Sequence, residues 1–157
     1  MKVSRIIQIV FILTFSGTCT ANDLLEVNLK GLTERGMLMR VLTNGRPIWI
    51  TYRTKAAINF IESKNIEYDK SKDPQYSNNI YRSINKDIFV VFGGCPDAKE
   101  LPSFYPDKGF ICSESGAIFD LAGRPLNNVT NNQPMAIPKH GYKNKTTLVI
   151  NTKQDGK

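Results

Sequence analysis

The stretch Phe110–Arg124 reads FICSESGAIFDLAGR, and its pattern decides the fold around it. Apolar and aromatic residues in Gly109–Cys112 and Ala117–Asp120 flank the short polar segment Ser113–Gly116. Strand-forming residues on both sides of a short segment that contains glycine are typical of a β-hairpin. The sequence therefore predicts two antiparallel strands here, with a cysteine at the start of the turn.

Two upstream patterns predict a second hairpin and one helix. Met37–Leu42 and Ile48–Tyr52 have strand-forming residues, and Asn44-Gly45 between them supplies the positive φ that a tight turn needs. Thr54 then stands as a candidate N-cap before Lys55–Glu62, where apolar residues recur at helical spacing. We therefore expect a short surface helix directly after this hairpin.

The remaining segments predict a small antiparallel β domain. Ile88–Phe92 is the most apolar run after the N-terminal segment, so we expect it to form a buried strand. Leu24–Leu32 alternates weakly, and Met135–Ile137 and Thr146–Ile150 are the expected late strands. The polar stretch Ser63–Asn85 is expected as an extended connection laid across the surface. The fold class is therefore mainly β with one short helix.

The N-terminal residues have the layout of a secretory signal peptide. Two basic residues precede the apolar run Ile6–Phe15, and small and polar residues follow as far as Ala21. The run is shorter than the roughly 20 residues that a membrane-spanning helix needs. We expect a signal peptide at residues 1–21 and a single domain at residues 22–157, hence a soluble periplasmic protein. A retained, membrane-associated N-terminus is the alternative.

Charge and motifs exclude several classes of function. The formal net charge of +7 falls to +5 once Lys2 and Arg5 leave with the signal peptide. The remaining basic residues are scattered and not clustered with aromatic residues, so we expect no nucleic-acid binding. The sequence has neither a glycine-rich phosphate-binding motif nor a catalytic constellation. We therefore predict no small-molecule substrate and a non-catalytic role.

Three cysteines remain to be assigned. Cys19 belongs to the expected signal peptide, which leaves Cys95 and Cys112 as an even pair in the exported domain. Cysteine pairs in an oxidising compartment are normally joined. A disulfide is therefore the expected state of these two residues.

Four pieces of the chain carry a family resemblance through their order and spacing. Asn44–Thr54 reads NGRPIWITYRT, Asp73–Gln75 reads DPQ, Ile88–Cys95 leads a strand into a loop, and Phe119–Arg124 reads FDLAGR. In this order they resemble four pieces of the Rieske iron–sulfur subunit of cytochrome bc1 complexes. The first resembles the family's Arg-Gly-Lys-Pro-Val-Phe-Ile-x-x-Arg-Thr and the second its Asp-Pro-Gln. The third stands where the family has the strand into its first cluster loop, and the fourth resembles its Tyr-Asp-x-Ser-Gly-Arg. The resemblance covers about residues 27–150 and implies a Rieske-like antiparallel β-sandwich.

The resemblance also identifies the cluster positions. A Rieske [2Fe–2S] centre binds one iron through two cysteines and the other through two histidines. By the resemblance, Cys95 and Cys112 occupy the two thiolate positions, whereas Asp97 and Ser115 occupy the two imidazole positions. The chain therefore resembles the family in its scaffold and departs from it in half of the cluster ligands.

Other positions of the family's site also differ. Glu100 and Glu114 stand where the family has the two cysteines that tie the loops together, and Ala117 and Phe119 replace its hydroxyl donors to the cluster sulfurs. The sequence holds a single histidine, His140, which we expect in a surface position or a loop. A centre with two histidine ligands therefore cannot form within this one chain.

These features predict an exported Rieske-fold protein without a cofactor. In the family two thiolates bind one iron, so the resemblance implies that the sulfurs of Cys95 and Cys112 lie close enough to form a disulfide. Such a bond would be worth roughly 3 kcal/mol in the chain-entropy model. We expect a non-catalytic structural or protein-binding module of the cell envelope.

Two other functions remain open. An electron-transfer protein of the ubiquinol-cytochrome c reductase type would hold a non-standard [2Fe–2S] cluster through Cys95, Asp97, Cys112 and Ser115. A thiol–disulfide exchange protein would use the two cysteines directly. The sequence around them offers acids and no cation that would lower a thiol pKa, which disfavours exchange.

The resemblance implies where a partner would bind. The cluster tip of the family docks onto other subunits, so the loops that follow the two cysteines are the candidate partner-binding tip. Its candidate residues are Phe104, Tyr105, Glu100 and Glu114, with packing in the core as the alternative for the aromatic pair. The partner itself is expected to be an envelope or membrane-complex protein of unknown identity.

Overall fold

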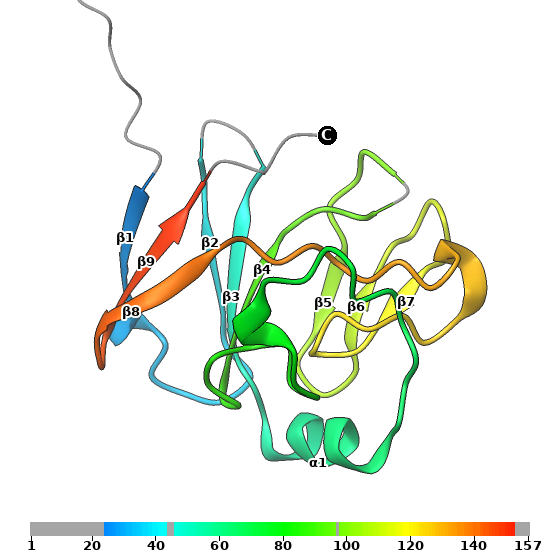
Figure 1. Ribbon diagram of the computed structural model, residues 1–157, viewed down its shortest axis with the longest axis horizontal. Helices are drawn as coiled ribbons and strands as arrows, with labels where there is room; N and C mark the ends of the chain where they lie inside the picture. The colour runs from blue at the N-terminus through cyan, green and yellow to red at the C-terminus, as the bar shows by residue number, and fades with distance from the viewer. Residues whose placement is uncertain (1–23, 44–45, 97, 153–157) are drawn as a thin grey trace, which may run out of the picture.

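The computed structural model describes residues 24–43, 46–96 and 98–152, and its regular structure is almost entirely antiparallel β (Figure 1). The strands of the described residues are β1 Leu24–Asn28, β2 Leu38–Val41, β3 Ile48–Tyr52, β4 Ile88–Phe92, β5 Ser103–Tyr105, β6 Gly109–Ile111, β7 Ile118–Phe119, β8 His140–Asn144 and β9 Thr147–Asn151. One α-helix, α1, spans Lys55–Ser63, and three short 3-10 helices lie at Leu29–Gly31, Gln75–Ser77 and Asn128–Thr130. The prediction of a mainly β fold with one short helix is confirmed.

The strands form three sheets of three strands each. Their orders are β1-β9-β8, β2-β3-β4 and β5-β6-β7, and every pairing is antiparallel. Figure 1 shows the β2-β3-β4 sheet between the other two, with α1 at the lower end of the molecule. The first and last strands of the described residues, β1 and β9, pair with each other in one sheet.

Strands β3 and β4 of the middle sheet are buried on both faces, to which their side chains point alternately along each strand. Ile48 and Ile50 of β3 pack in one core cluster with Leu148 and Ile150 of β9. Trp49, between them, packs in a second cluster with side chains of β4, α1 and the third sheet. Burial on both faces explains why β3 and β4 read as continuous apolar runs and not as alternating ones.

Helix α1 confirms the predicted helix and its cap. Thr54 has an extended backbone, and its hydroxyl accepts a hydrogen bond of 3.0 Å from the backbone N–H of Ala57. Ala57, Ile58 and Ile61 are buried, as their spacing predicts. The helix therefore covers one end of the core that also contains Trp49.

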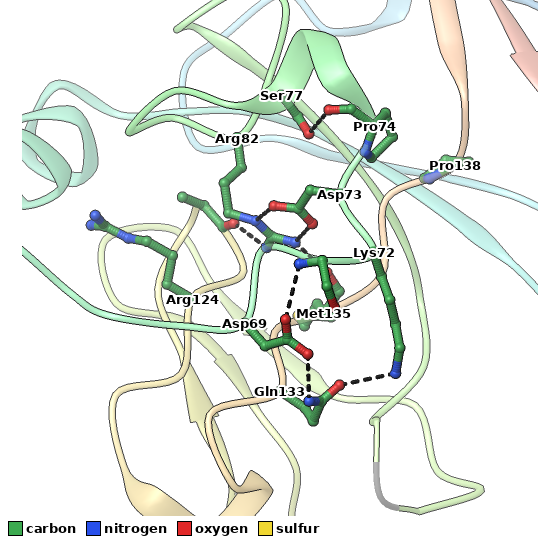
Figure 2. A network of polar contacts seen from close by, with 12 residues as sticks. Asp69, Lys72, Asp73, Pro74, Ser77, Arg82, Arg124, Gln133, Met135 and Pro138 are labelled. Atoms are coloured by element: carbon green, nitrogen blue, oxygen red, sulfur yellow. Dashed lines mark hydrogen bonds and ion pairs between the residues drawn. The ribbon is translucent and has the colours of Figure 1, made fainter.

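The connection from Ser63 to Asn85 corrects the expectation of a segment laid across the surface. Arg82 in this connection is completely buried, and its Nε donates to Asp73 Oδ2 at 2.8 Å (Figure 2). Ile80 and Ile84, two of the few strongly apolar residues of this connection, are 50% and 44% exposed. Polar groups with full sets of partners therefore attach this segment to the core.

Of the two expected late strands, Thr146–Ile150 is confirmed as β9, whereas Met135–Ile137 is not a strand. The reason is that the backbone hydrogen bonds of Met135–Ile137 are made with two different segments. Met135 N–H donates to the Gly123 carbonyl, and the Ala136 carbonyl accepts from Phe92 N–H, each at 2.9 Å. His140, expected in a surface position or a loop, begins β8 instead and is half-buried. Strand β5 also differs from expectation, because it lies within Pro96–Pro106, whose turn-forming residues predict a loop.

Some predictions concern residues outside the described ranges. They are the signal peptide at residues 1–21, the Asn44-Gly45 turn and Asp97. Within the described ranges, no helix combines the length and the apolar character that crossing a membrane requires.

Candidate functional site

Cys112 lies in the β6–β7 hairpin that the sequence predicts. Phe110 pairs with Phe119 across the two strands, and the Cys112 N–H donates to the Ala117 carbonyl at 2.8 Å. The Cys112 carbonyl accepts from Gly116 N–H, also at 2.8 Å, and Gly116 has a φ of +72°. Backbone bonds thus fix the turn on both sides of the cysteine.

Cys95 is placed by the end of β4. Gly93 N–H donates to the Pro47 carbonyl at 2.7 Å, and a Cβ atom on Gly93 would lie 2.3 Å from Nε1 of Trp49. Glycine is therefore required where the chain passes the indole ring. Two residues later, the Cys95 N–H donates to the Glu100 carbonyl at 3.1 Å and closes the loop that begins there.

A disulfide joins Cys95 to Cys112, which confirms the predicted pairing. Their Cα atoms lie 6.0 Å apart. The exposed fractions of the two residues are 4% and 0%, and both belong to the core cluster around Trp49. The bond links the loop after the middle sheet to the hairpin of the third sheet, at the end of that sheet away from α1 (Figure 1).

The Glu100 carboxylate lies beside this disulfide. A carboxylate oxygen of Glu100 and the sulfurs of Cys95 and Cys112 all lie within 4.8 Å of one another. Glu100 is half-buried, and its Oε1 accepts a hydrogen bond of 2.9 Å from Glu114 N–H. We call Cys95, Glu100 and Cys112 the cysteine site.

The sequence places Glu100 in the candidate tip, at a position where the family has a loop-tying cysteine, but it does not predict the approach of the carboxylate to the two sulfurs. One feature of the sequence could have indicated this closeness. In the family, that loop-tying cysteine stands next to the cluster ligands. In the structure, Glu100 still ties the loops together through its bond to the backbone of Glu114. A carboxylate thus makes the contact between loops that a cysteine makes in the resembling family.

Of the other predicted site residues that the structure describes, Ser115 lies in the turn after Cys112, whereas Tyr105 lies at the opposite end of β5, where the next residue, Pro106, accepts a hydrogen bond from the Thr54 hydroxyl. The Ser115 hydroxyl accepts from Ala117 N–H at 3.3 Å within the hairpin turn. Phe104 packs on Phe110 with ring centroids 5.7 Å apart, whereas Tyr105 is 43% exposed. The role of this tip in partner binding stays a prediction.

Buried arginines attach the surrounding loops. Arg53 is completely buried and donates hydrogen bonds to the Leu121, Lys86 and Tyr81 carbonyls at 2.6–2.7 Å. Burial lowers the pKa of Arg53 to about 9, although the Asp120 charge raises it, so the guanidinium remains charged at neutral pH. The sequence analysis did not predict buried roles for Arg53 and Arg82.

The Asp120–Arg124 turn is fixed in a similar way. Asp120 Oδ1 accepts from the backbone N–H groups of Ala122 and Arg124 at 2.8 and 2.9 Å, and its Oδ2 accepts from Arg124 Nε at 2.7 Å. Both side chains are almost fully buried. This paired charge positions the chain that follows β7 against the core.

The single histidine of the sequence contacts Tyr76 and Pro138. Nδ1 of His140 lies 2.9 Å from the Tyr76 hydroxyl and 2.9 Å from the Pro138 carbonyl. Burial lowers the pKa of His140, and burial raises the pKa of Tyr76 to about 12. Strand β8, which carries His140, lies on the far side of the middle sheet from β5-β6-β7 (Figure 1).

Comparison with known proteins identifies relatives of this chain. It is 32% identical to the ubiquinol-cytochrome c reductase iron-sulfur subunit of Allochromatium vinosum, in an alignment that covers 74% of this chain and 64% of that protein. It is 30% identical to the corresponding subunit of Bradyrhizobium diazoefficiens, with 69% and 61% covered. It is also 30% identical to the mitochondrial cytochrome b-c1 complex subunit Rieske-3 of Nicotiana tabacum, with 76% and 44% covered. The chain is a relative of the Rieske iron–sulfur proteins.

This Rieske-related chain spans less than two thirds of the length of these relatives. No protein-family model matches it. Among solved structures, the ferredoxin of carbazole 1,9a-dioxygenase from Nocardioides aromaticivorans matches with a TM-score of 0.46 and 12% sequence identity, over 81% of this chain and 94% of the ferredoxin.

The donor atoms of the cysteine site do not fit a Rieske centre. Such a centre needs two thiolates and two imidazoles. Here the two sulfurs are bonded to each other, the neighbouring donor is a carboxylate, and the only histidine of the sequence contacts Tyr76 and Pro138. The arrangement provides a buried covalent link between two loops and, when reduced, a pair of thiols next to an acid.

Proposed function

We propose that this Rieske-related protein is exported and acts, without an iron–sulfur cluster, as a structural or protein-binding module of the cell envelope. The observation that carries the proposal is the Cys95–Cys112 disulfide, which occupies the two positions that resemble the thiolate ligands of the family. A cysteine bonded to another cysteine has no thiolate to offer iron. The disulfide therefore replaces the cluster as the link between the two loops.

The packing around the disulfide supports this proposal. Cys95 and Cys112 lie in the same apolar cluster as Trp49, Phe110 and Phe119, so the loops are attached to the core without a cofactor. Backbone hydrogen bonds close each loop separately. The scaffold thus has what it needs for a stable fold, and its exposed loop residues remain available to a partner.

A binding surface at the tip agrees with such a role. Leu101, next to Glu100, is 60% exposed, and Tyr105, at the far end of β5, is 43% exposed. Exposed apolar and aromatic side chains of this kind are common anchors in protein interfaces. The proposed partner is a protein of the envelope or of a membrane complex. The signal-like residues 1–21 support export.

A second candidate function is electron transfer. The relatives are iron–sulfur subunits by name, and Glu100 adds a third donor beside the two sulfurs. A non-standard cluster would require the disulfide to be absent. The burial of both sulfurs argues against the third function, thiol exchange, because exchange requires access to a sulfur.

Anaerobic purification of the full chain from its cell envelope tests the proposal. We expect a colourless protein without iron or acid-labile sulfide, whose mass is two hydrogen atoms lower than after reduction. We also expect an N-terminus at residue 22. Two irons per chain and an electron paramagnetic resonance signal on reduction would support the electron-transfer candidate instead.

Site-specific photo-crosslinking in cells tests the binding role. A photoreactive residue at Leu101 should give a discrete crosslinked product with an envelope protein. The same residue at Lys143, an exposed position of β8, is the matched control and should give none. Equal products from both positions, or none from Leu101, would contradict a binding surface at this tip.

A further inference from the structure

We propose that the reduced form of this protein binds one thiophilic divalent metal ion at the cysteine site. The ligands are the thiolates of Cys95 and Cys112 and the carboxylate of Glu100. The disulfide and the metal are then two mutually exclusive states of one site. This inference goes beyond the proposed function, which concerns the oxidised chain.

The distances allow a single ion. Zn²⁺ lies about 2.3 Å from thiolate sulfur and about 2.0–2.2 Å from carboxylate oxygen, so two sulfurs on one tetrahedral ion are about 3.8 Å apart. The three donor atoms here already lie within 4.8 Å of one another. With Cα atoms 6.0 Å apart, the two cysteines can open to the required separation by rotating their side chains.

The loops remain positioned when the disulfide is reduced. The bond from Cys95 N–H to the Glu100 carbonyl involves no sulfur, and neither do the two bonds between Cys112 and the residues of its turn. Each cysteine therefore keeps its place through its own backbone. A site that exists before the ion arrives loses less entropy on binding.

Glu100 is also oriented in advance. Its Oε1 accepts from Glu114 N–H at 2.9 Å, which fixes the carboxylate. Hydrogen bonds of this type to metal-ligating carboxylates set their orientation and strengthen metal binding. Because a carboxylate has two oxygens, Glu100 can keep this bond and still offer an oxygen to the ion.

Charge and ligand type define the metal. Two thiolates and a carboxylate carry three negative charges, which are costly to bury without a cation. Cys95 and Cys112 are almost completely buried, so a divalent ion would stabilise their ionised forms. Thiolate ligands select zinc and similar soft ions over magnesium and calcium. The fourth tetrahedral position is left to water, as in open zinc sites.

The experiment starts from the full chain, oxidised or reduced with a water-soluble phosphine. The phosphine and water become phosphine oxide while the disulfide takes up two electrons and two protons, so that two thiols form. Each sample is titrated anaerobically with Co²⁺, whose thiolate charge-transfer absorption reports sulfur ligation, and then with Zn²⁺ in competition. We expect one Co²⁺ per reduced chain, displaced by Zn²⁺, and none bound by the oxidised chain.

Variants separate the ligands from the surrounding acids. Glu100→Gln should weaken Zn²⁺ binding by at least tenfold. Even the loss of a residue that only hydrogen-bonds to a metal ligand lowers metal affinity by about 10–100-fold. Glu114→Gln is the matched control, because its backbone N–H is unchanged, and it should bind like the original chain. The Cys95→Ser, Cys112→Ser double variant should show no charge-transfer band.

Three outcomes would overturn the inference. Equal Co²⁺ binding by oxidised and reduced chains would place the ion elsewhere. An unchanged affinity in Glu100→Gln would remove the carboxylate from the site. Circular dichroism is recorded in parallel, and a reduced chain that loses its β signal and does not regain it with Zn²⁺ would also contradict a preformed site. None of these outcomes decides whether the protein isolated from cells holds a cluster or binds a partner, so the proposed function is tested separately.

Discussion

At the scale of single residues, buried arginines attach the polar segment Ser63–Asn85 to the core. Arg82 donates to Asp73 and to the Ala122 and Met135 carbonyls while its side chain is completely buried (Figure 2). Its φ of +48° lies in the left-handed region, which costs a residue other than glycine about 1–2 kcal/mol. The buried ion pair and hydrogen bonds offset this cost and make the conformation stable.

Replacing Arg82 should therefore be severe. We predict that Arg82→Ala lowers the free energy of unfolding by about 3–5 kcal/mol, because it leaves a buried carboxylate without its partner. Urea denaturation followed by circular dichroism measures the change. Lys143→Ala is the control: it breaks an exposed ion pair with Glu26 and should cost less than about 1 kcal/mol. Similar costs for both variants would contradict a central role for Arg82.

At the scale of elements, local signals allowed accurate prediction and long-range contacts did not. The bounds of β3 match the expected segment, and α1 begins after the predicted cap Thr54, because both depend on neighbouring residues alone. Met135–Ile137 has the composition of a strand but no continuous partner strand. The burial of Arg82 depends on Asp73 and on carbonyls distant in sequence, which no local pattern reveals.

The candidate site divides in the same way. The Cys95–Cys112 disulfide followed from an even cysteine pair and from the family resemblance. The approach of Glu100 to the sulfurs depends on a hydrogen bond to Glu114 in another loop. Such a contact between two loops has no signature in either loop alone, so the sequence could identify the residues but not their arrangement.

The contact between β8 and the 3-10 helix Gln75–Ser77 predicts a pH dependence. Burial lowers the pKa of His140 below its usual 6.5, so the unfolded chain binds this proton more readily than the folded chain. Stability should therefore fall as the pH drops below about 6.5 and through the lower folded pKa. Urea midpoints measured between about pH 7.5 and about pH 5 test this direction.

A substitution assigns the effect to His140. His140→Asn keeps a polar group near Tyr76 but cannot take up a proton, so it should flatten the dependence. Asp69 also contributes stability that acid removes. Hydrogen bonds from Ser71 lower its pKa from 3.8 to about 2, so this stability is lost at a lower pH than the contribution of His140. An unchanged slope in His140→Asn would show that another group controls this pH range.

At the scale of the whole molecule, the middle sheet makes the domain one cooperative unit. Its alternate residues belong to the two core clusters, one shared with β9 and one with the third sheet. The disulfide adds a covalent link between the middle and third sheets at the end of the molecule away from α1. Removing that link should lower stability without separating the sheets.

We predict that the Cys95→Ser, Cys112→Ser double variant unfolds in a single transition and that its free energy of unfolding is about 3 kcal/mol lower. The reason is that the unfolded chain regains the conformational entropy of the loop that the disulfide closes, with a sequence separation of 17. Trp49, the only tryptophan of the sequence, reports on one core by fluorescence, while far-ultraviolet circular dichroism reports on all three sheets. Coincident urea curves are expected from both probes. The reduced original chain, measured without metal, should show the same loss. Separate transitions, or a loss below about 1 kcal/mol, would mean that the disulfide does not link the folding of the two sheets.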